Sequence, residues 1–448
     1  MQPRVAGLLA VLSAAVFASL AACSAPSGVP TQSESASSAP PASLADSDAA
    51  GTDVTATSTE PLSAVTPTVP PAARVQVSVP PHPAPRRARL VFTGDVLSHG
   101  PVTRQAHANG SSDLRYDYRP MFAQVRDSIA SADLAICHLE SPLSADNTDL
   151  SGYPLFNAPG DLAVGLADAG YDGCSVASNH SLDRGIDGIT ATLEVLERHG
   201  LGHAGMARTP AEAAMPSIYV VNGIVIGHLS YTYGLNDIPL PPDRDWAVDV
   251  IDRDAIEAEA QAAVAAGAEF VILSIQWGPE YTSVPNASQR RLANNLLADS
   301  DIDLIVGSHA HVPQPIGKVG DKFVIFGLGY FLTNQSPLSC RSCPAATVDG
   351  VLVEVVLAET PADRIEVAAL GATPTWVDRP HYTIVDVADE LAGDLGPNRR
   401  GVLERSWQRT AGVLRAEGVD IVIEGDPAGT QAISGAPDIP SAWPLALR

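Results

Sequence analysis

The stretch DLIVGSHAHVPQP, residues 303–315, places two histidines directly after a run of apolar residues. His309 and His311 are two positions apart, and side chains two positions apart in extended backbone point to the same side. The pair could therefore address one metal ion or two adjacent ions, or it could be two polar residues of an exposed loop. The rest of the chain decides between these interpretations.

Other short apolar runs of the chain also end in polar residues. They are RLVFT before Gly94-Asp95, DLAICH before Leu139-Glu140, DGCSVAS before Asn179-His180, EFVILSI before Gln276-Trp277 and KFVIFG before Leu328-Gly329. Helical spacing of apolar residues separates many of them, at 116–130, 161–169, 185–199, 253–266 and 287–299. This alternation predicts an α/β fold with a largely parallel or mixed sheet.

Three further segments predict antiparallel strands. VVNGIVIGHLS (220–230) contains Asn-Gly, which is typical of a hairpin turn, and IGKVGDKFVIF (316–326) repeats this pattern around Gly-Asp. Residues 350–374 also alternate as antiparallel strands do. Parallel units combined with hairpins predict two packed sheets with helices outside.

In open α/β sheets, ligands bind beyond the carboxyl ends of the strands. One polar residue there is ordinary turn chemistry, but polar side chains after five strands indicate a site. These are Asp95, Glu140, Asn179, His180, Gln276, His309 and His311. Carboxylate, amide and imidazole groups without thiolates suit Mn, Fe or Zn. Two such ions, about 3.5–4 Å apart, need a bridging carboxylate, for which Asp95 or Glu140 could serve, and a non-ligating His180 could protonate a leaving group.

The charge of the chain excludes nucleic acid as a partner. The 448 residues carry a formal net charge of −24, and Lys318 and Lys322 are the only lysines. A nucleic-acid-binding protein needs a basic face, and this composition cannot build one.

The N-terminus predicts export and membrane attachment. Arg4 precedes an apolar segment that ends in Leu-Ala-Ala-Cys23, which resembles the lipobox of bacterial lipoproteins. An uncleaved membrane anchor is the alternative. We interpret residues 1–23 as a lipoprotein signal peptide with Cys23 lipidated, and 24–88 as a disordered linker because it has few large apolar residues. The protein would then be exported and lipid-anchored at the outer face of the cytoplasmic membrane.

Four other cysteines indicate disulfides in an oxidising compartment. Cys137 and Cys174 end two predicted strands and could pair if these strands are neighbours, or they could be free buried thiols. Cys340 and Cys343, in CRSC, could close a small loop.

Six segments resemble the CapA family of bacterial capsule-synthesis or poly-γ-glutamate-synthesis proteins, which is related to the calcineurin-like metallophosphoesterases. They are FTGDVLSH, HLESPL, SNHSLDRGIDG, QWGPEY, GSHAHVPQP and FGLGYFL, in this order within residues 89–335. The resemblance implies a four-layer α/β/β/α sandwich with a dinuclear metal centre. We place this domain at 89–375, followed by a C-terminal extension at 376–448 that is partly helical, around 398–416, and ends in a loose tail.

The resemblance also implies roles for individual residues. Asp95, Glu140 (as the bridging carboxylate), Asn179, His309 and His311 would bind metal, with His99 as a possible companion, and His180 would be the acid. Asp183, Gly185 and Gly188 would shape the loop and the start of the following helix. Many family members have His-Trp-Gly-x-Glu where this chain has Gln276-Trp277-Gly278-Pro279-Glu280. Gln is a weaker ligand than His, so the second metal would be loosely held or absent.

Two functions remain open at this stage. The first is a metal-dependent hydrolase or transferase of phosphoesters or amides in capsule or cell-envelope polymer synthesis. The second is a non-catalytic module with a degraded site that binds the polymer or its synthesis and export machinery. A net charge of −24 disfavours a polyanionic partner except where metal ions reverse the local field.

Overall fold

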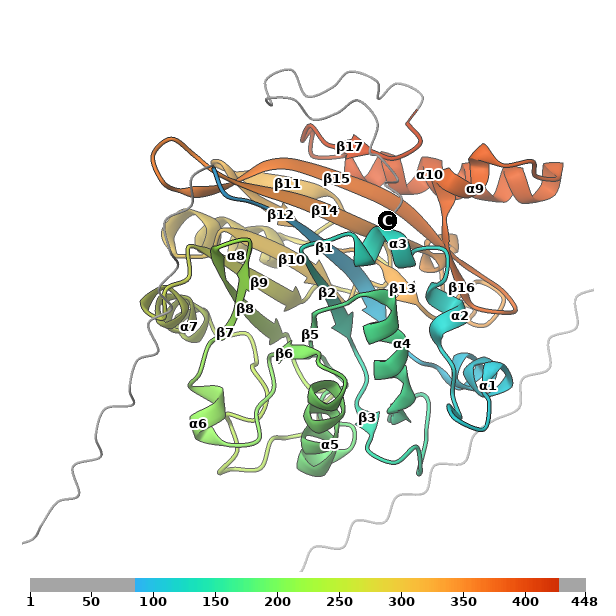
Figure 1. Ribbon diagram of the computed structural model, residues 1–448, viewed down its shortest axis with the longest axis horizontal. Helices are drawn as coiled ribbons and strands as arrows, with labels where there is room; N and C mark the ends of the chain where they lie inside the picture. Colours follow the sequence, from blue (N-terminus) through green and yellow to red (C-terminus); the bar gives the residue numbers. More distant parts are fainter. Residues whose placement is uncertain (1–84, 427–448) are drawn as a thin grey trace, which may run out of the picture. The chain divides into compact units, whose positions relative to one another are not determined.

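The computed structural model describes residues 85–426. The predicted signal peptide, Cys23, nearly all of the linker and the end of the C-terminal tail lie outside the described residues. Two large β-sheets pack face to face, and helices cover the outer face of each (Figure 1). The predicted four-layer α/β/β/α fold class is confirmed.

The first sheet combines a parallel half with an antiparallel half. Its strands follow the order β16-β15-β14-β1-β2-β5-β6, with β13 beside β1 and β17 beside β15. β1, β2, β5 and β6 are parallel to one another, whereas β14, β15 and β16 are antiparallel neighbours. The bounds are β1 Arg87–Val96, β2 Leu134–Leu139, β5 Gly173–Ser175, β6 Gly202–Ala204, β13 Tyr330–Leu332, β14 Asp349–Glu359, β15 Ile365–Asp378, β16 Thr383–Asp386 and β17 Val422–Ile423.

The second sheet has the order β11-β12-β10-β9-β8-β7. Its four central strands are parallel. The edge strands β7 and β11 are antiparallel to their neighbours β8 and β12, with which they form the two predicted hairpins. Both hairpins are thus confirmed. Asn222 and Gly223 turn the first hairpin with φ of 49° and 79°, as a type I′ turn requires. The bounds are β7 Ser217–Val221, β8 Ile224–Thr232, β9 Phe270–Gln276, β10 Leu304–Ser308, β11 Ile316–Val319 and β12 Lys322–Ile325; β3 Leu143–Ser144 and β4 Ala158–Pro159 form a separate small sheet.

Alternating side chains of one strand enter different cores. On β1, Leu90 and Phe92 enter the core between the sheets, whereas Val91 packs under the helices of the first sheet. On β9, Ile272 enters the core between the sheets and Leu273 the core under the helices of the second sheet. Both faces of these strands are therefore buried, which explains why they appear in the sequence as unbroken apolar runs.

Most helices lie in layers outside the sheets. Helices α1 to α5 contribute to the core outside the first sheet and α7 and α8 to the core outside the second. Helices α9 and α10 pack on β15, and Ala411 and Leu414 of α10 join the core between the sheets. None of the helices within residues 85–426 is long and apolar enough to cross a membrane. The bounds are α1 Gly100–Asn109, α2 Arg119–Phe122, α3 Arg126–Ala130, α4 Asp161–Ala169, α5 Gly185–Arg198, α6 Pro210–Ala213, α7 Arg253–Ala265, α8 Ala287–Asp299, η1 Ala345–Val348, α9 Val387–Ala392 and α10 Pro397–Leu414.

The boundary placed after residue 375 falls inside β15. The chain beyond it continues in the same sheet, because β16 and β17 both pair with β15. Helix α10 is fixed to β14 by Arg409, whose Nε donates to Asp349 Oδ2 at 2.9 Å, and by Ser406, whose hydroxyl donates to Oδ1 at 2.7 Å. Residues 376–426 are thus packed onto the first sheet.

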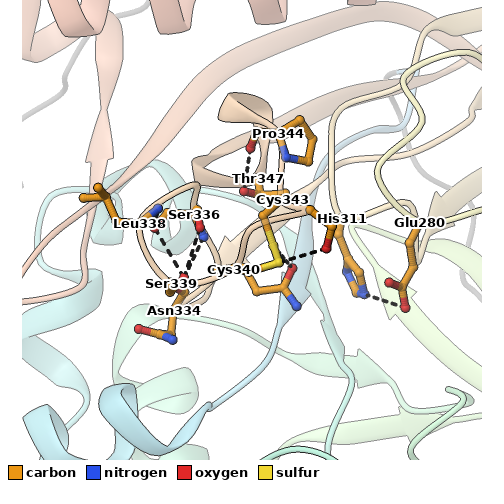
Figure 2. The surroundings of a disulfide bond; sticks show 12 residues. Glu280, His311, Asn334, Ser336, Leu338, Ser339, Cys340, Cys343, Pro344 and Thr347 are labelled. Carbon is orange, nitrogen blue, oxygen red and sulfur yellow. Dashed lines mark hydrogen bonds and ion pairs between the residues drawn. A yellow bond between two sulfur atoms is a disulfide. The ribbon is translucent and has the colours of Figure 1, made fainter. Parts of the chain in front are cut away.

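Both expected cysteine pairs form disulfides. Cys137 and Cys174 face each other on β2 and β5. These two strands are neighbours, as the pairing of the two cysteines requires. Cys340 and Cys343 close the loop that precedes η1 (Figure 2).

A close backbone contact fixes the end of β1. The Asp95 amide donates to Gly329 O at 2.9 Å, and a Cβ added at Gly94 would lie 1.9 Å from the same oxygen. Only glycine allows β1 to approach the segment before β13 this closely.

Gly94→Ala should therefore lower the free energy of unfolding by about 1–3 kcal/mol, as overpacking in a rigid interior does. Denaturant unfolding measures the change. Gly412→Ala is the control, because that exposed helical position has nothing within 4 Å of the added carbon and should be neutral or stabilising. Equal unfolding midpoints for Gly94→Ala and the wild type would contradict this role of Gly94.

Candidate metal centre

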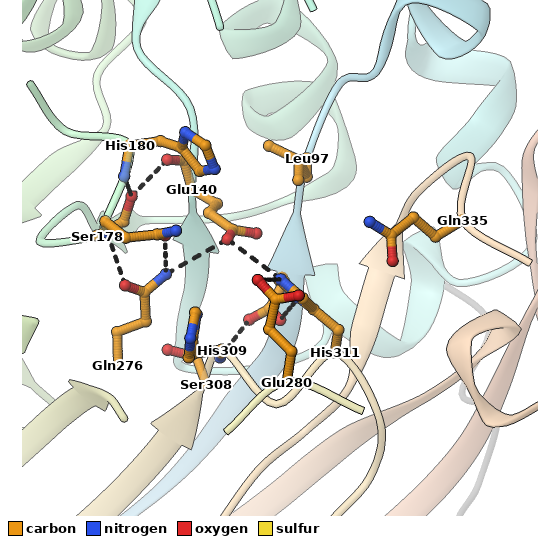
Figure 3. A network of polar contacts seen from close by, with 12 residues as sticks. Leu97, Glu140, Ser178, His180, Gln276, Glu280, Ser308, His309, His311 and Gln335 are labelled. Atoms are coloured by element: carbon orange, nitrogen blue, oxygen red, sulfur yellow. Dashed lines mark hydrogen bonds and ion pairs between the residues drawn. The ribbon is translucent and has the colours of Figure 1, made fainter. Parts of the chain in front are cut away.

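Polar side chains from both sheets meet beyond the carboxyl ends of their parallel strands (Figure 3). Asp95 lies at the end of β1, Glu140 directly follows β2, and Gln276 is the last residue of β9. His309 and His311 follow β10. All five side chains are almost fully buried. The structure thus brings together, from four strands, residues that are far apart in the sequence.

The His-x-His segment is a strained turn rather than the extended backbone expected from the sequence. His309 and His311 have φ of 84° and 58°, which non-glycine residues adopt at an energetic cost. The turn is held by Tyr281, whose amide donates to Ala310 O at 2.7 Å, and by Asp95, whose Oδ1 accepts from the His309 amide at 3.4 Å. The two imidazole rings remain 5.5 Å apart and face one site.

Asp95 determines which nitrogen of His311 faces the site. His311 Nδ1 lies 2.9 Å from Asp95 Oδ2, and a carboxylate accepts the Nδ1 proton. Nε2 of His311 is then a lone-pair acceptor, and it lies 3.6 Å from Glu140 Oε1. A carboxylate that orients a metal-binding histidine in this way is common around metal ions. The hydrogen bond gives Asp95 an orienting position, besides the ligand role implied by the family resemblance.

Three ligand atoms converge, and two of the side chains that carry them have an atom without a hydrogen-bond donor. One atom each from Glu140, His309 and His311 lies within 4.8 Å of the others. Glu140 Oε2 and His309 Nδ1 are buried and have no hydrogen-bond partner within the described residues. Such groups are costly unless a cation or a hydrogen-bond donor satisfies them. These three ligands fit one divalent metal ion.

The charges around the two buried carboxylates also favour a bound cation. Burial, followed by the repulsion from Asp95, raises the pKa of Glu140 well above its usual range. Burial also raises the pKa of Asp95 to about 6. Within the described chain, no Lys or Arg pairs with either carboxylate. A bound cation would supply the missing positive charge.

Gln276 lies at the centre, but its amide presents a donor there. Its Oε1 accepts from the Asn179 amide at 2.7 Å and from Thr232 Oγ1 at 2.8 Å. Nε2 must therefore face Asn179 Oδ1, at 2.9 Å, and Glu140 Oε1, at 3.4 Å. An NH₂ group cannot bind a metal ion. The region around Asn179 and Gln276 therefore does not fit a second ion.

His180 is held beside the centre by Asp183. His180 Nδ1 lies 2.7 Å from Asp183 Oδ2, which also accepts from the Phe156 amide at 2.6 Å. Asn236 Nδ2 lies 3.3 Å from the same ring nitrogen, but the shorter contact, to a carboxylate, decides the tautomer. Nε2 of His180 then remains available for a substrate.

The other predicted residues lie around this centre. His99 Nδ1 is 3.2 Å from Leu97 O, and the His99 ring packs edge-on to Phe156, outside the three converging ligands. Gly185 begins α5 with φ of 63°, and a Cβ on Gly188 would lie 2.4 Å from the Arg184 side chain. Both glycines therefore shape the start of the helix that follows His180.

Several neighbours of the centre were not singled out from the sequence. Tyr330 stacks on His311 with ring centroids 4.2 Å apart, and Tyr233 lies 4.4 Å from His309. Asn236 Oδ1 accepts from the Asn179 side chain at 3.1 Å, and Glu280 reaches His311. Tyr330 and Glu280 belong to the quoted segments FGLGYFL and QWGPEY, so a signal was present for them. Tyr233 and Asn236 lie in a loop without a motif.

Metal removal should make the stability of the protein depend on pH in a defined direction. The raised pKa values of Asp95 and Glu140 mean that their contribution to stability is present below about pH 4 and is lost as the pH rises through about 6 and above. A bound cation favours the ionised carboxylates. At one fixed Mn²⁺ concentration, the rise in melting temperature of chelator-treated protein should therefore be larger at pH 7.5 than at pH 5, and a concentration about 100 times the Kd at pH 7.5 should add about 2.7 kcal/mol at that pH. Glu140→Gln should reduce this difference, and an increment that is the same at both pH values would contradict it.

Comparison with known proteins gives the family. The family model described as bacterial capsule synthesis protein PGA_cap matches residues 89–335, more than half of the chain. The PGA biosynthesis protein CapA of Bacillus subtilis (strain 168) is 28% identical over 318 residues, 68% of this chain and 77% of that protein. The capsule biosynthesis protein CapA of Bacillus anthracis is 22% identical over 265 residues, 57% of this chain and 62% of that protein.

Among solved structures, the calcineurin-like phosphoesterase YfkN from Bacillus subtilis aligns with a TM-score of 0.38 and 14% identity, covering 73% of this chain and 98% of that chain. This alignment assigns no activity. The residues matched by the family model include Asp95, Glu140, His309 and His311. The chain belongs to the CapA family of bacterial capsule synthesis proteins.

Proposed function

We propose that this protein is a metal-dependent hydrolase or transferase that acts on a phosphoester or amide bond in the synthesis of a capsule or a cell-envelope polymer of the poly-γ-glutamate type. The observation that carries the proposal is the convergence of ligand atoms of Glu140, His309 and His311, two of which, Glu140 and His309, also keep a buried atom without a partner among the described residues. His180, oriented by Asp183, faces the same place. Family membership supplies the polymer context.

The residues divide the chemistry between them. A divalent ion supplies charge to polarise the scissile group and to activate water. Glu140, His309 and His311 would hold it, and Asp95 keeps Nε2 of His311 directed inward. A protonated His180 can give its Nε2 proton to the leaving oxygen or nitrogen, while the Asp183 carboxylate stabilises the imidazolium.

The metal would be Mn, Fe or Zn, with one firmly held ion rather than the two that the family resemblance implies. The amide of Gln276 supports this number, because its NH₂ group faces Asn179 and Glu140. A second ion at this position would have to displace those hydrogen bonds.

Gln276→His should raise the metal-to-protein ratio of the purified chain from about one towards two, because imidazole is the better ligand for these metals. Elemental analysis of protein loaded with Mn²⁺ or Zn²⁺ measures the ratio. Thr232→Val is the control, since it removes a contact of Gln276 without adding a ligand. An unchanged ratio in Gln276→His would contradict the role given to this amide.

His180→Gln should lower kcat for a phosphodiester such as bis-p-nitrophenyl phosphate by at least about 100-fold, the usual range for loss of a general acid. Metal content should not change, since His180 is not among the converging ligands. His381→Gln, at an exposed position, is the matched control. An activity of His180→Gln equal to that of the control would rule out the acid role.

A non-catalytic role is the second candidate, and Gln276 favours it, because loss of a metal ligand is a common way for a site to lose activity. The protein would then bind the polymer or its synthesis and export machinery. Metal binding without turnover of phosphodiester or γ-glutamyl amide substrates would favour this candidate.

We also propose that the protein is exported and lipid-anchored through Cys23 at the outer face of the cytoplasmic membrane, with the linker separating the domain from the membrane. The sequence pattern around Cys23 supports this location. The predicted end of that linker at residue 88 is wrong, because Arg87 and Ala88 already belong to β1. A net charge of −24 would oppose direct contact with a polyglutamate chain unless metal ions intervene.

A further inference from the structure

Two side chains that lie against the buried histidines reach solvent. The ring centroid of Tyr233 is 4.4 Å from that of His309, and Tyr233 is 45% exposed. Glu280 Oε1 lies 3.9 Å from His311 Nε2, and 42% of the Glu280 side chain is exposed (Figure 3). Both histidines are only 3% exposed. Tyr233 and Glu280 therefore mark the side from which solvent, and a substrate, would reach the centre.

The two tyrosines that pack closely on the histidines differ in their exposure. Tyr330 stacks on His311 with ring centroids 4.2 Å apart and is fully buried, so its ring contributes packing alone. Tyr233 packs on His309 with part of its ring and leaves the rest in water. A half-exposed ring is stabilised by the arrival of a second ring, because that contact removes apolar surface from water and allows stacking.

The loop that follows β8 holds Tyr233 in place. The Tyr233 amide donates to Gln276 O at 3.0 Å, and the hydroxyl of the preceding Thr232 donates to Gln276 Oε1 at 2.8 Å. Three residues further along, Asn236 Oδ1 accepts from the Asn179 side chain at 3.1 Å. The segment is thus tied to both sheets. A group that packs on the Tyr233 ring would lose little binding free energy to the ordering of this loop.

The surroundings of Tyr233 favour an uncharged group. Burial, followed by the charges of Glu280 and Glu140, raises the pKa of Tyr233 to about 12, so its hydroxyl is neutral at pH 7. The bound ion would hold the oxygen of the scissile group, whereas Tyr233 and Glu280 beside it offer no positive charge. A second anionic group of the substrate would therefore be repelled by Glu280 at this position.

We propose that Tyr233 is a specificity-determining residue, whose exposed face receives an uncharged ring of the substrate next to the scissile phosphoester or amide bond. The ring is that of a sugar or an aromatic group, since both offer a flat apolar face to a tyrosine. The inference rests on the proposed metal-dependent function, and it narrows the substrate class of that function to molecules that carry such a ring.

The test is the affinity of the full-length, Mn²⁺-loaded protein for phosphonates, whose carbon–phosphorus bond a phosphoesterase does not hydrolyse. Calorimetry compares methylphosphonate, phenylphosphonate and cyclohexylphosphonate for the wild type, Tyr233→Ala, Tyr233→Phe and Val264→Ala. Val264 is the control because it is 44% exposed, as Tyr233 nearly is, but lies on α7 in the helix layer outside the second sheet.

We expect the wild type to bind phenylphosphonate at least about 10-fold more tightly than methylphosphonate, a usual gain from stacking on an aromatic side chain. Tyr233→Ala should lose this preference without a change in the Kd of methylphosphonate or of Mn²⁺. Tyr233→Phe and Val264→Ala should keep the preference. Cyclohexylphosphonate distinguishes the two kinds of ring: an affinity equal to that of phenylphosphonate indicates a saturated ring such as a sugar, and a weaker affinity indicates an aromatic ring.

A wild type that binds the three phosphonates equally, or binds none of them, would overturn the role of Tyr233 and leave metal binding intact. The role is also overturned if Tyr233→Ala weakens the binding of methylphosphonate or Mn²⁺ as much as that of phenylphosphonate, because the ring would then only support His309. A wild-type protein that binds no Mn²⁺, Zn²⁺ or Fe²⁺ would instead overturn the proposed function.

Discussion

The arrangement of this domain depends on buried acceptor atoms that meet where the two sheets end. Glu140, His309 and His311 are removed from water, and some of their atoms have no donor within the described chain. Burial of such groups opposes folding unless a cation joins them. The two sheets pack face to face, and their parallel strands end at one edge. This packing buries the acceptor atoms at an electrostatic cost, and it also brings them close enough to bind one ion.

The residue that distinguishes this centre from the family pattern is Gln276, at the end of β9. Gln276 presents hydrogens to Asn179 and Glu140, and its orientation is fixed because its oxygen accepts from a backbone amide. Glu280, four residues further along the chain, lies with its Oε1 3.9 Å from His311 Nε2. On the proposed function, the centre keeps a metal ion at Glu140, His309 and His311, although Gln276 stands where many family members have histidine.

Much of the fold could be predicted from the sequence, because strands buried on both faces and helices with regular apolar spacing leave strong patterns. The segment 161–169 is α4, as predicted. The segment 116–130, in contrast, contains two short helices with a turn between them, although its buried apolar residues all enter the core outside the first sheet. Helix α1 was not predicted, because Val102 and Ala106 are its only buried residues and two residues do not make a helical apolar pattern.

The candidate site was predictable in its members but not in its contacts. The strand-end rule and the family resemblance named Asp95, Glu140 and the two histidines. The hydrogen bond from His311 to Asp95, the left-handed backbone of the His-x-His turn and the approach of Glu280 all depend on tertiary packing. Local sequence does not encode distances between segments that lie tens of residues apart.

The most direct test of this account is a crystal structure of the protein soaked in Mn²⁺, with anomalous scattering to locate the ion. The account predicts one strong peak about 2.0–2.3 Å from His309 Nδ1, His311 Nε2 and a Glu140 oxygen, with no second peak between Asn179 and Gln276. An anomalous map without a peak at Glu140, and with ordered water bound to His311 Nε2, would contradict it.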